Sequence, residues 1–232
     1  MARHLRLSGD LCGRLVVVGD VHGCLDELEE MLTKVGPWDI LVLAGDLVNK
    51  GPRSHEVVKL VQAAVSAPNS NFYAVRGNHD EAAIRAYHKY KHTEDADEVP
   101  LKYRWTKQLQ EDEVAFLEAL PYTIAIPSHN VLVVHAGLNL ACKELESQST
   151  EDLVTIRSWG EDYDGGYGHV VFGHHAKRGL QQLPHATGID TGCVYGRELT
   201  ALVVLDDEAK SKSLVHVKAR AIYSPPAAGD EG

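Results

Sequence analysis

The sequence is poor in the features that mark membrane-bound and disulfide-stabilised proteins. No stretch approaches the ~20 consecutive apolar residues that cross a bilayer, and the first residues lack the apolar core of a secretory signal. The chain has only four cysteines in 232 residues, and they form no closely spaced pair of the zinc-ribbon kind. We therefore expect reduced thiols and a cytoplasmic protein without a membrane partner.

Positive charge is also scarce. Lys and Arg total 23 against 33 Asp and Glu, which gives a formal net charge of -10. A protein that binds duplex DNA normally presents a basic surface, so this balance argues against that class. It does not exclude an enzyme that binds one phosphate group locally. The apolar fraction of 44% is ordinary for a soluble globular chain.

Short apolar runs alternate with helical patterns in the first third of the chain. Residues 15–18, 40–44 and 72–75 have the composition of buried strands, while residues 25–35 and 57–61 carry apolar residues at helical spacing. This β-α-β-α-β order predicts an α/β fold with a mainly parallel sheet and right-handed crossovers.

The rest of the chain adds a polar insertion and further strands. Residues 87–103 are rich in charge, and we interpret them as an exposed excursion or cap. A short helix, a hairpin and three later strands are expected at 114–120, at 122–126 with 131–135, and at 169–172, 199–205 and 214–217. The expected organisation is one domain over residues 14–220, between an N-terminal extension, 1–13, and a C-terminal tail, 221–232.

Polar residues follow the first three predicted strands at the points where these strands end. The sequences are Gly-Asp-Val-His-Gly at 19–23, Gly-Asp-Leu-Val-Asn-Lys-Gly at 45–51 and Gly-Asn-His-Asp at 77–80. Ligands gather at the carboxyl ends of parallel strands. We therefore expect five side chains to converge in one crevice: Asp20, His22, Asp46, Asn78 and His79. Two more histidines, His135 and His174, also follow apolar strands.

The residue types of this set are those that bind divalent metals of intermediate hardness. Six such ligands exceed what one tetrahedral site needs, so the set predicts two ions that share Asp46 as a bridging carboxylate. We expect Mn, with Fe, Co or Zn as alternatives. Two metals polarise phosphoryl oxygens and acidify a bound water, and a positioned acid then protonates the leaving oxygen. His79, next to Asn78, is the candidate for that acid.

Taken together, the motifs resemble those of the calcineurin-like metallophosphoesterases, within the phosphoprotein phosphatase superfamily. Residues 45–52, 77–80, 172–174 and 189–196 (Ile-Asp-Thr-Gly-Cys-Val-Tyr-Gly) are similar to the ApaH-like branch, the symmetric diadenosine tetraphosphatases. The likeness runs from about Arg14 to Leu205. It implies a fold of two mixed β-sheets packed as a sandwich and flanked by helices.

The resemblance also implies roles for the motif residues. One metal would be held by Asp20, His22 and Asp46. The other would be held by Asp46, Asn78, His135 and His174. His79 would be the general acid.

Three cations are candidates for holding the phosphate. Lys50 and Arg76 stand where the family places such groups, and Arg157 is a third candidate that no firm motif supports. Protein phosphatases have Asp-Arg where this chain has Asn49-Lys50, and that Asp orients the catalytic histidine. We expect Asn49 to be a second catalytic residue that takes the place of this Asp beside His79. It can accept a hydrogen bond but carries no charge, which weakens a protein-phosphatase interpretation. Lys lacks the bidentate fork of Arg, so we expect it to hold phosphate less rigidly.

The resemblance implies a hydrolase that cleaves phosphoanhydride bonds in dinucleoside polyphosphates, with diadenosine tetraphosphate cut symmetrically to ADP. The same centre would serve other substrates, so the cap of messenger RNA, inorganic polyphosphate, and phosphoserine or phosphothreonine are alternatives. An alternative of another class is a metal-binding adaptor that has lost catalysis.

Overall fold

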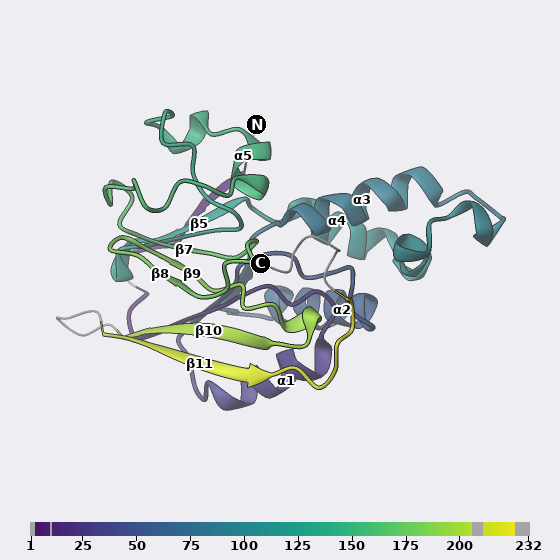
Figure 1. The fold of residues 1–232 in the computed structure, drawn as a ribbon, viewed down its shortest axis with the longest axis horizontal. Helices are drawn as coiled ribbons and strands as arrows, with labels where there is room; N and C mark the ends of the chain where they lie inside the picture. The colour runs from purple at the N-terminus through teal and green to yellow at the C-terminus, as the bar shows by residue number, and fades with distance from the viewer. Residues whose placement is uncertain (1–2, 10, 206–210, 226–232) are drawn as a thin grey trace.

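Two mixed β-sheets pack face to face and carry helices on their outer faces (Figure 1). The computed structural model describes residues 3–9, 11–205 and 211–225. One sheet has the strand order β11-β10-β2-β3-β4, and the other has the order β1-β5-β6-β7-β9-β8. The fold is therefore the α/β sandwich that the motif resemblance implied.

Parallel strands form the centre of the first sheet. Its strands are β2 (Arg14–Val18), β3 (Ile40–Leu43), β4 (Phe72–Ala74), β10 (Glu198–Leu205) and β11 (Lys212–Lys218). β2, β3 and β4 run parallel, as the alternation of strands and helices predicted. β10 and β11 add an antiparallel pair beside β2.

The second sheet contains the predicted hairpin. Its strands are β1 (His4–Arg6), β5 (Thr123–Ile126), β6 (Val131–Val134), β7 (His169–Phe172), β8 (Gln181–Gln182) and β9 (Ala186–Gly188). β5 and β6 are antiparallel, with Thr123 opposite Val134, and β6 runs parallel to β7. The turns around these strands include three 3-10 helices: η3 (Pro127–His129), η4 (Leu145–Ser147) and η5 (Cys193–Tyr195).

The core has three layers because successive strand side chains point to opposite faces. Val16 and Val18 of β2 pack in the layer that includes α1 (Leu25–Lys34) and α2 (Ser54–Ser66), whereas Val17 packs in the layer between the sheets. A third layer joins the outer face of the second sheet to α5 (Thr150–Thr155). One run of buried valines therefore fills two layers.

The charged segment 87–103 forms an excursion, as predicted. α3 (Asn78–Tyr90) leads into it, and the chain returns through η1 (Ala96–Glu98), η2 (Leu101–Gln108) and α4 (Glu111–Ala119). Figure 1 shows α3 and the returning chain extending to one side of the sandwich. η2 packs back along α3, and its Trp105 hydrogen-bonds to Asn49.

Three short strands were not expected from the sequence: β1, β8 and β9. β1 lies within the segment interpreted as an N-terminal extension, and its His4 pairs with Thr123 of β5 in parallel. Three residues offer too little alternation to reveal a strand. Of the C-terminal tail, residues 226–232 lie outside the described residues. Within the described part of the chain, no helix is both long and apolar enough to cross a membrane.

Candidate metal centre and active-site cleft

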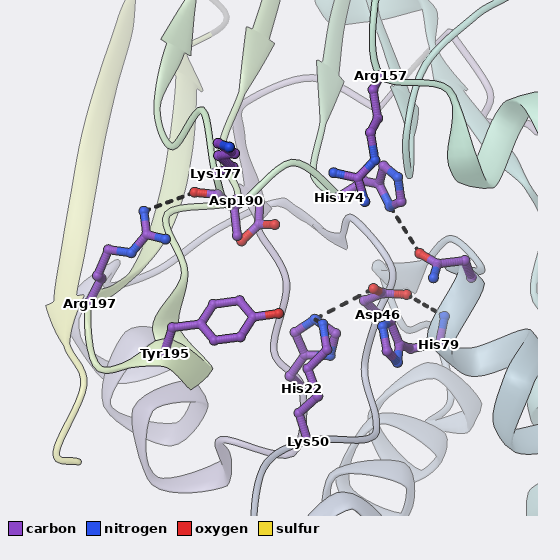
Figure 2. A pocket seen from close by; sticks show the side chains of 12 residues that line it. His22, Asp46, Lys50, His79, Arg157, His174, Lys177, Asp190, Tyr195 and Arg197 are labelled. Atoms are coloured by element: carbon purple, nitrogen blue, oxygen red, sulfur yellow. Dashed lines mark hydrogen bonds and ion pairs between the residues drawn. The ribbon is translucent and has the colours of Figure 1, made fainter. Parts of the chain in front are cut away.

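Five loops meet at one edge of the sandwich, where strands of both sheets end. Each loop follows one strand and carries an Asp, Asn or His side chain of the kind that binds metals. The strands are β2, β3, β4, β6 and β7. The loops bring together the predicted set: Asp20, His22, Asp46, Asn78, His79, His135 and His174 (Figure 2). The sequence-based prediction of one crevice thus matches the geometry.

These loops hold backbone conformations that most side chains avoid. His22, Asp46 and His174 have φ of 47°, 49° and 68°, and Asn49 and Lys50 have φ of 69° and 67°. Elsewhere in the described chain, the non-glycine residues with positive φ are two asparagines, which tolerate it best. Such positions cost of order 1–3 kcal/mol each and cluster where function requires them. The strain is thus concentrated at these strand ends, as is typical of functional sites.

Asp46 lies between two groups of ligands. Its Oδ2 is 3.5 Å from His22 Nε2, and its Oδ1 is 3.4 Å from His135 Nε2. The main-chain nitrogen of His79 donates to Oδ1 over 2.8 Å and fixes the carboxylate. Because the two oxygens face different histidines, the carboxylate has the orientation of a bridge between two ions.

Asn78 and two histidines form the group on one side of Asp46. His135 Nε2 and His174 Nδ1 lie 3.1 Å and 3.0 Å from Asn78 Oδ1. His135 Nδ1 lies 2.9 Å from the carbonyl oxygen of Ala44, so this nitrogen donates and Nε2 presents its lone pair.

His22 and Asp20 form the group on the other side. His22 Nδ1 donates to the carbonyl of Val48 over 3.0 Å, and His22 Nε2 lies 4.0 Å from Asp20 Oδ2. The ammonium of Lys50 is 3.1 Å from the same Nε2. The lone pair of His22 thus already faces a cation.

The electrostatics of the cluster require added positive charge. Burial holds the pKa of His135 down to about 4, and burial together with Lys50 holds the pKa of His22 well below its usual value. Burial raises the pKa of Asp46 to about 7, and burial with the neighbouring carboxylates raises the pKa of Asp20. The imidazoles are therefore neutral and offer their lone pairs. The buried carboxylates beside them are disfavoured as anions unless a cation lies nearby.

The residues present therefore fit divalent metals. Ligand atoms of His22, Asp46 and His79 all lie within 4.8 Å of one another, and so do those of Asp46, His135 and His174. Asp46 belongs to both groups, as the sequence predicted. The first group contains His79 where the resemblance implied Asp20.

Asn49 does not orient the His79 ring, and this corrects the sequence-based expectation. Its Nδ2 donates to the main-chain carbonyl of His79 over 2.9 Å, and its Oδ1 accepts from Trp105 Nε1 over 2.8 Å. The acceptor oxygen is thus occupied by the indole. The His79 ring itself packs edge-on against His22, with ring centroids 4.8 Å apart, and burial holds its pKa down to about 3.

Two of the three predicted phosphate cations reach the cleft. Lys50 and Arg157 line it, and Figure 2 shows Arg157 beside His174. Arg76 instead turns away. Its guanidinium contacts the Tyr122 hydroxyl at 3.1 Å and Glu81 at 3.5 Å, and also the carbonyl of Glu118. The structure therefore does not bring Arg76 to the site.

Four cleft residues with polar side chains received no role from the sequence: Lys177, Asp190, Tyr195 and Arg197. Asp190 and Tyr195 lie in the motif at 189–196, so the resemblance did carry a signal for them. Asp190 is 5% exposed, and burial raises its pKa. Lys177 and Arg197 are exposed loop residues, and nothing in their sequence pattern distinguishes them from other surface cations.

Comparison with known proteins agrees with the site. The family model described as calcineurin-like phosphoesterase matches residues 13–205, which include every predicted ligand. The chain belongs to the calcineurin-like phosphoesterase family. Among curated relatives of this phosphoesterase are proteins from Oceanobacillus iheyensis and Bacillus subtilis, both named bis(5'-nucleosyl)-tetraphosphatase PrpE (asymmetrical). They are 28% and 27% identical to the chain, over 81% and 79% of its length and 87% and 88% of theirs.

Solved structures share the fold of this phosphoesterase. A crystal structure described as a "putative diadenosine tetraphosphatase" is 32% identical, with a TM-score of 0.78, and the match covers 94% of this chain and 99% of that one. A protein serine/threonine phosphatase from Saccharomyces cerevisiae is 19% identical, with a TM-score of 0.64 over 97% of this chain and 85% of its own. The second likeness shows a common fold alone.

Proposed function

We propose that this phosphoesterase hydrolyses phosphoanhydride bonds in dinucleoside polyphosphates, with two divalent metal ions bound at the strand ends. The observation that carries the proposal is the composition of the cleft. Its metal-ligand groups are surrounded by Lys50, Arg157, Lys177 and Arg197, although the chain as a whole has a net charge of -10. Such a concentration of cations suits a substrate with several phosphate groups.

The size of the cleft supports the same substrate class. It encloses about 90 Å³, far less than the ~300–1,000 Å³ of clefts that bury drug-sized ligands. Phosphate groups fit this volume, whereas a nucleoside does not. The nucleosides of the substrate would therefore lie along the rim while the phosphate chain enters.

The metal ligands would divide as the family resemblance implies. Asp20, His22 and Asp46 would hold one ion, and Asp46, Asn78, His135 and His174 the other. Two divalent ions, which we propose to be Mn, would polarise the phosphoryl oxygens and acidify a water. Lys50 and Arg157 would hold the remaining oxygens of the attacked phosphate.

The surroundings of His79 favour a phosphoanhydride over a phosphoserine. Among the described residues, none accepts a hydrogen bond from the His79 ring, and the side-chain oxygen of Asn49 is bonded to Trp105. Without a hydrogen-bond acceptor beside the ring, the protonated imidazolium form of His79 is not stabilised. An alkoxide leaving group needs a proton from such an acid, whereas a nucleotide departs from a phosphoanhydride with far less assistance.

The position of cleavage is a separate question. The motif resemblance predicts symmetric cleavage to ADP, while the two named relatives are asymmetrical enzymes. Symmetric cleavage thus stays a prediction. The named relatives give no support to capped RNA as a substrate, and the likeness to a serine/threonine phosphatase extends to the fold only.

Product analysis tests the proposal. The Mn-loaded protein is incubated with diadenosine tetraphosphate, and early products are separated by chromatography. ADP alone would support symmetric cleavage, and equal amounts of AMP and ATP would support the asymmetrical type. Absence of turnover on this substrate and on p-nitrophenyl phosphate, in protein that retains two metals, would instead support the adaptor.

A further inference from the structure

Three cleft residues lie together on one side of the metal-ligand cluster. Lys177 is in the loop that follows His174, Tyr195 ends η5, and Arg197 immediately precedes β10. Figure 2 shows them grouped with Asp190 on the side opposite Arg157, with the Tyr195 ring directed toward His22. Cations thus border the cluster on both sides.

Arg197 is held in place by its own loop. Its main-chain nitrogen donates to the carbonyl of Gly192 over 3.2 Å. Gly192 has φ of 73°, and a Cβ added there would lie 2.9 Å from Arg197 Nε, so the guanidinium packs directly over this glycine. Arg197 Nη1 donates to the carbonyl of Ala176 over 2.9 Å. This bond ties Arg197 to the loop that carries Lys177.

Arg197 differs from several other surface arginines of the described chain in that no carboxylate pairs with its guanidinium. Arg104, Arg178 and Arg220 each have a carboxylate oxygen within 3.3 Å. In the described part of the chain, no carboxylate forms an ion pair with Arg197. Asp190, an acid of the cleft wall, is buried, which raises its pKa although the charge of Arg197 acts to lower it, and it accepts from the main-chain nitrogen of Gly192 over 3.1 Å. An exposed, fixed guanidinium of this kind is suited to bind an anion.

Tyr195 links this side of the cleft to the metal-ligand side. Lys50 Nζ lies 5.2 Å from the centroid of the Tyr195 ring and 3.1 Å from His22 Nε2. The cleft is therefore continuous from the metal ligands, past Lys50 and Tyr195, to Arg197. A ligand with several linked phosphates can span this path, and a single phosphate cannot.

We propose that Lys177 and Arg197 form a second anion subsite, which binds phosphate groups of the substrate other than the one attacked at the metals. The inference rests on the proposed function and makes it more specific. Phosphate bound at Arg197 fixes which phosphorus lies over the metal ligands, so the subsite sets both the preference for long phosphate chains and the position of cleavage. A phosphomonoester occupies the metal site alone.

The test compares Arg197→Ala and Lys177→Ala with Arg178→Ala. Arg178 is the matched control because it is an exposed arginine of the same loop region that pairs with Glu161 and lies outside the cleft. The first readout is calorimetric binding of inorganic tripolyphosphate to each metal-loaded variant at saturating Mn. The second is the ratio of kcat/KM for diadenosine tetraphosphate to that for p-nitrophenyl phosphate.

Loss of the charged hydrogen bonds should weaken tripolyphosphate binding about tenfold or more in each cleft variant and lower the ratio by a similar factor, mainly through KM. Arg197→Lys should recover part of both losses. Equal binding and equal ratios in Arg197→Ala, Lys177→Ala and Arg178→Ala would overturn the subsite. Lys177→Ala keeps the bond between Arg197 and Ala176, so it remains decisive if Arg197→Ala disturbs the loop.

The outcomes separate the subsite from the proposed function. If diadenosine tetraphosphate is not hydrolysed but tripolyphosphate binding still depends on Arg197 and Lys177, the substrate assignment fails and the subsite stands. If diadenosine tetraphosphate is hydrolysed equally well by all variants, the subsite fails and the proposed function stands. A change from one product pattern to a mixture in Arg197→Ala would support its role in fixing the attacked phosphorus.

Discussion

The indole nitrogen of Trp105 donates a hydrogen bond to the side-chain oxygen of Asn49 over 2.8 Å. Asn49 is 3% exposed, and its amide donates in turn to the main-chain carbonyl of His79 over 2.9 Å. η2, the segment that returns from the excursion, is thereby bonded through Trp105 to the loop after β3 and to the start of α3. This contact joins a segment that looks like a surface insertion to the centre of the active site.

Trp105→Phe should destabilise the protein by ~1–3 kcal/mol, because it leaves the buried Asn49 oxygen without a donor. Urea unfolding measures the change. Trp38→Phe is the control, since Trp38 is also half-buried and packs on Phe72. Equal losses in the two variants would mean that packing, and not the hydrogen bond, accounts for the effect.

Asn49→Asp should destabilise the metal-loaded protein and should not move the basic limb of the pH–rate profile upward. The substitution removes the donor to the His79 carbonyl and places a carboxylate oxygen against it. Urea unfolding and the pH profile of kcat test the two parts. An upward shift of the basic limb without loss of stability would show that residue 49 acts on the His79 ring after all.

Asp46→Asn should remove more metal than His22→Gln. The two oxygens of Asp46 face His22 and His135 respectively, so we propose that this side chain would contribute to both ions, whereas His22 would contribute to one. Metal analysis should give two equivalents in the unaltered protein, close to one in His22→Gln and less than one in Asp46→Asn. Two full equivalents in Asp46→Asn would contradict the bridging role.

His79→Asn should reduce activity more on phenyl phosphate than on diadenosine tetraphosphate. A general acid contributes roughly 10²–10⁴ in rate when the leaving oxygen needs a proton, and a nucleotide leaving group needs it least. Values of kcat for both substrates, in protein with matched metal content, test the difference. Equal losses on the two substrates would remove His79 from the acid role.

His169→Gln should destabilise the protein less at pH 5 than at pH 7, by about 1–2 kcal/mol. Burial, with Lys212 and His185, lowers the pKa of His169 to about 4. Between pH 6.5 and 4 the unfolded chain binds a proton here and the folded chain does not, so this contribution is complete above pH 6.5 and is lost as the pH falls. Urea unfolding at both pH values measures it.

A loss of stability in His169→Gln that does not depend on pH would mean that only its hydrogen bond to Thr187, at 2.8 Å, matters.

The convergence of the proposed metal ligands could be predicted from sequence because each one follows a short apolar strand and most have a glycine beside them. Gly19-Asp20 and Gly45-Asp46 show this pattern, and the strand end fixes where such a residue must lie. Once the main chain of such a residue is placed at a strand end, its short side chain can lie only near this edge of the sheet. Lys50, which continues the loop after Asp46, was identified by the resemblance to the family instead.

Side-chain direction could not be predicted in this way. Arg76 directly precedes Gly77 in a motif loop, yet Glu81 and Tyr122 attract its guanidinium away from the cleft. Asn49 has its oxygen bonded by Trp105, which is 56 residues later in the chain. Partners of this kind depend on packing between distant segments, and Arg197 reaches the cleft only because β10 returns beside β2.

The loops of the metal centre have a consequence for how the enzyme is synthesised and folded. Asp20 accepts the main-chain nitrogen of His174, 154 residues away, so the two halves of the centre leave the ribosome at different times. A nascent chain that ends before β6 carries Asp46 and Asn78 but neither His135 nor His174. Such a chain has His22 beside its carboxylates, but it lacks the imidazoles of the second group. Contacts of such long range form late, so metal capture should coincide with the final docking of the two sheets.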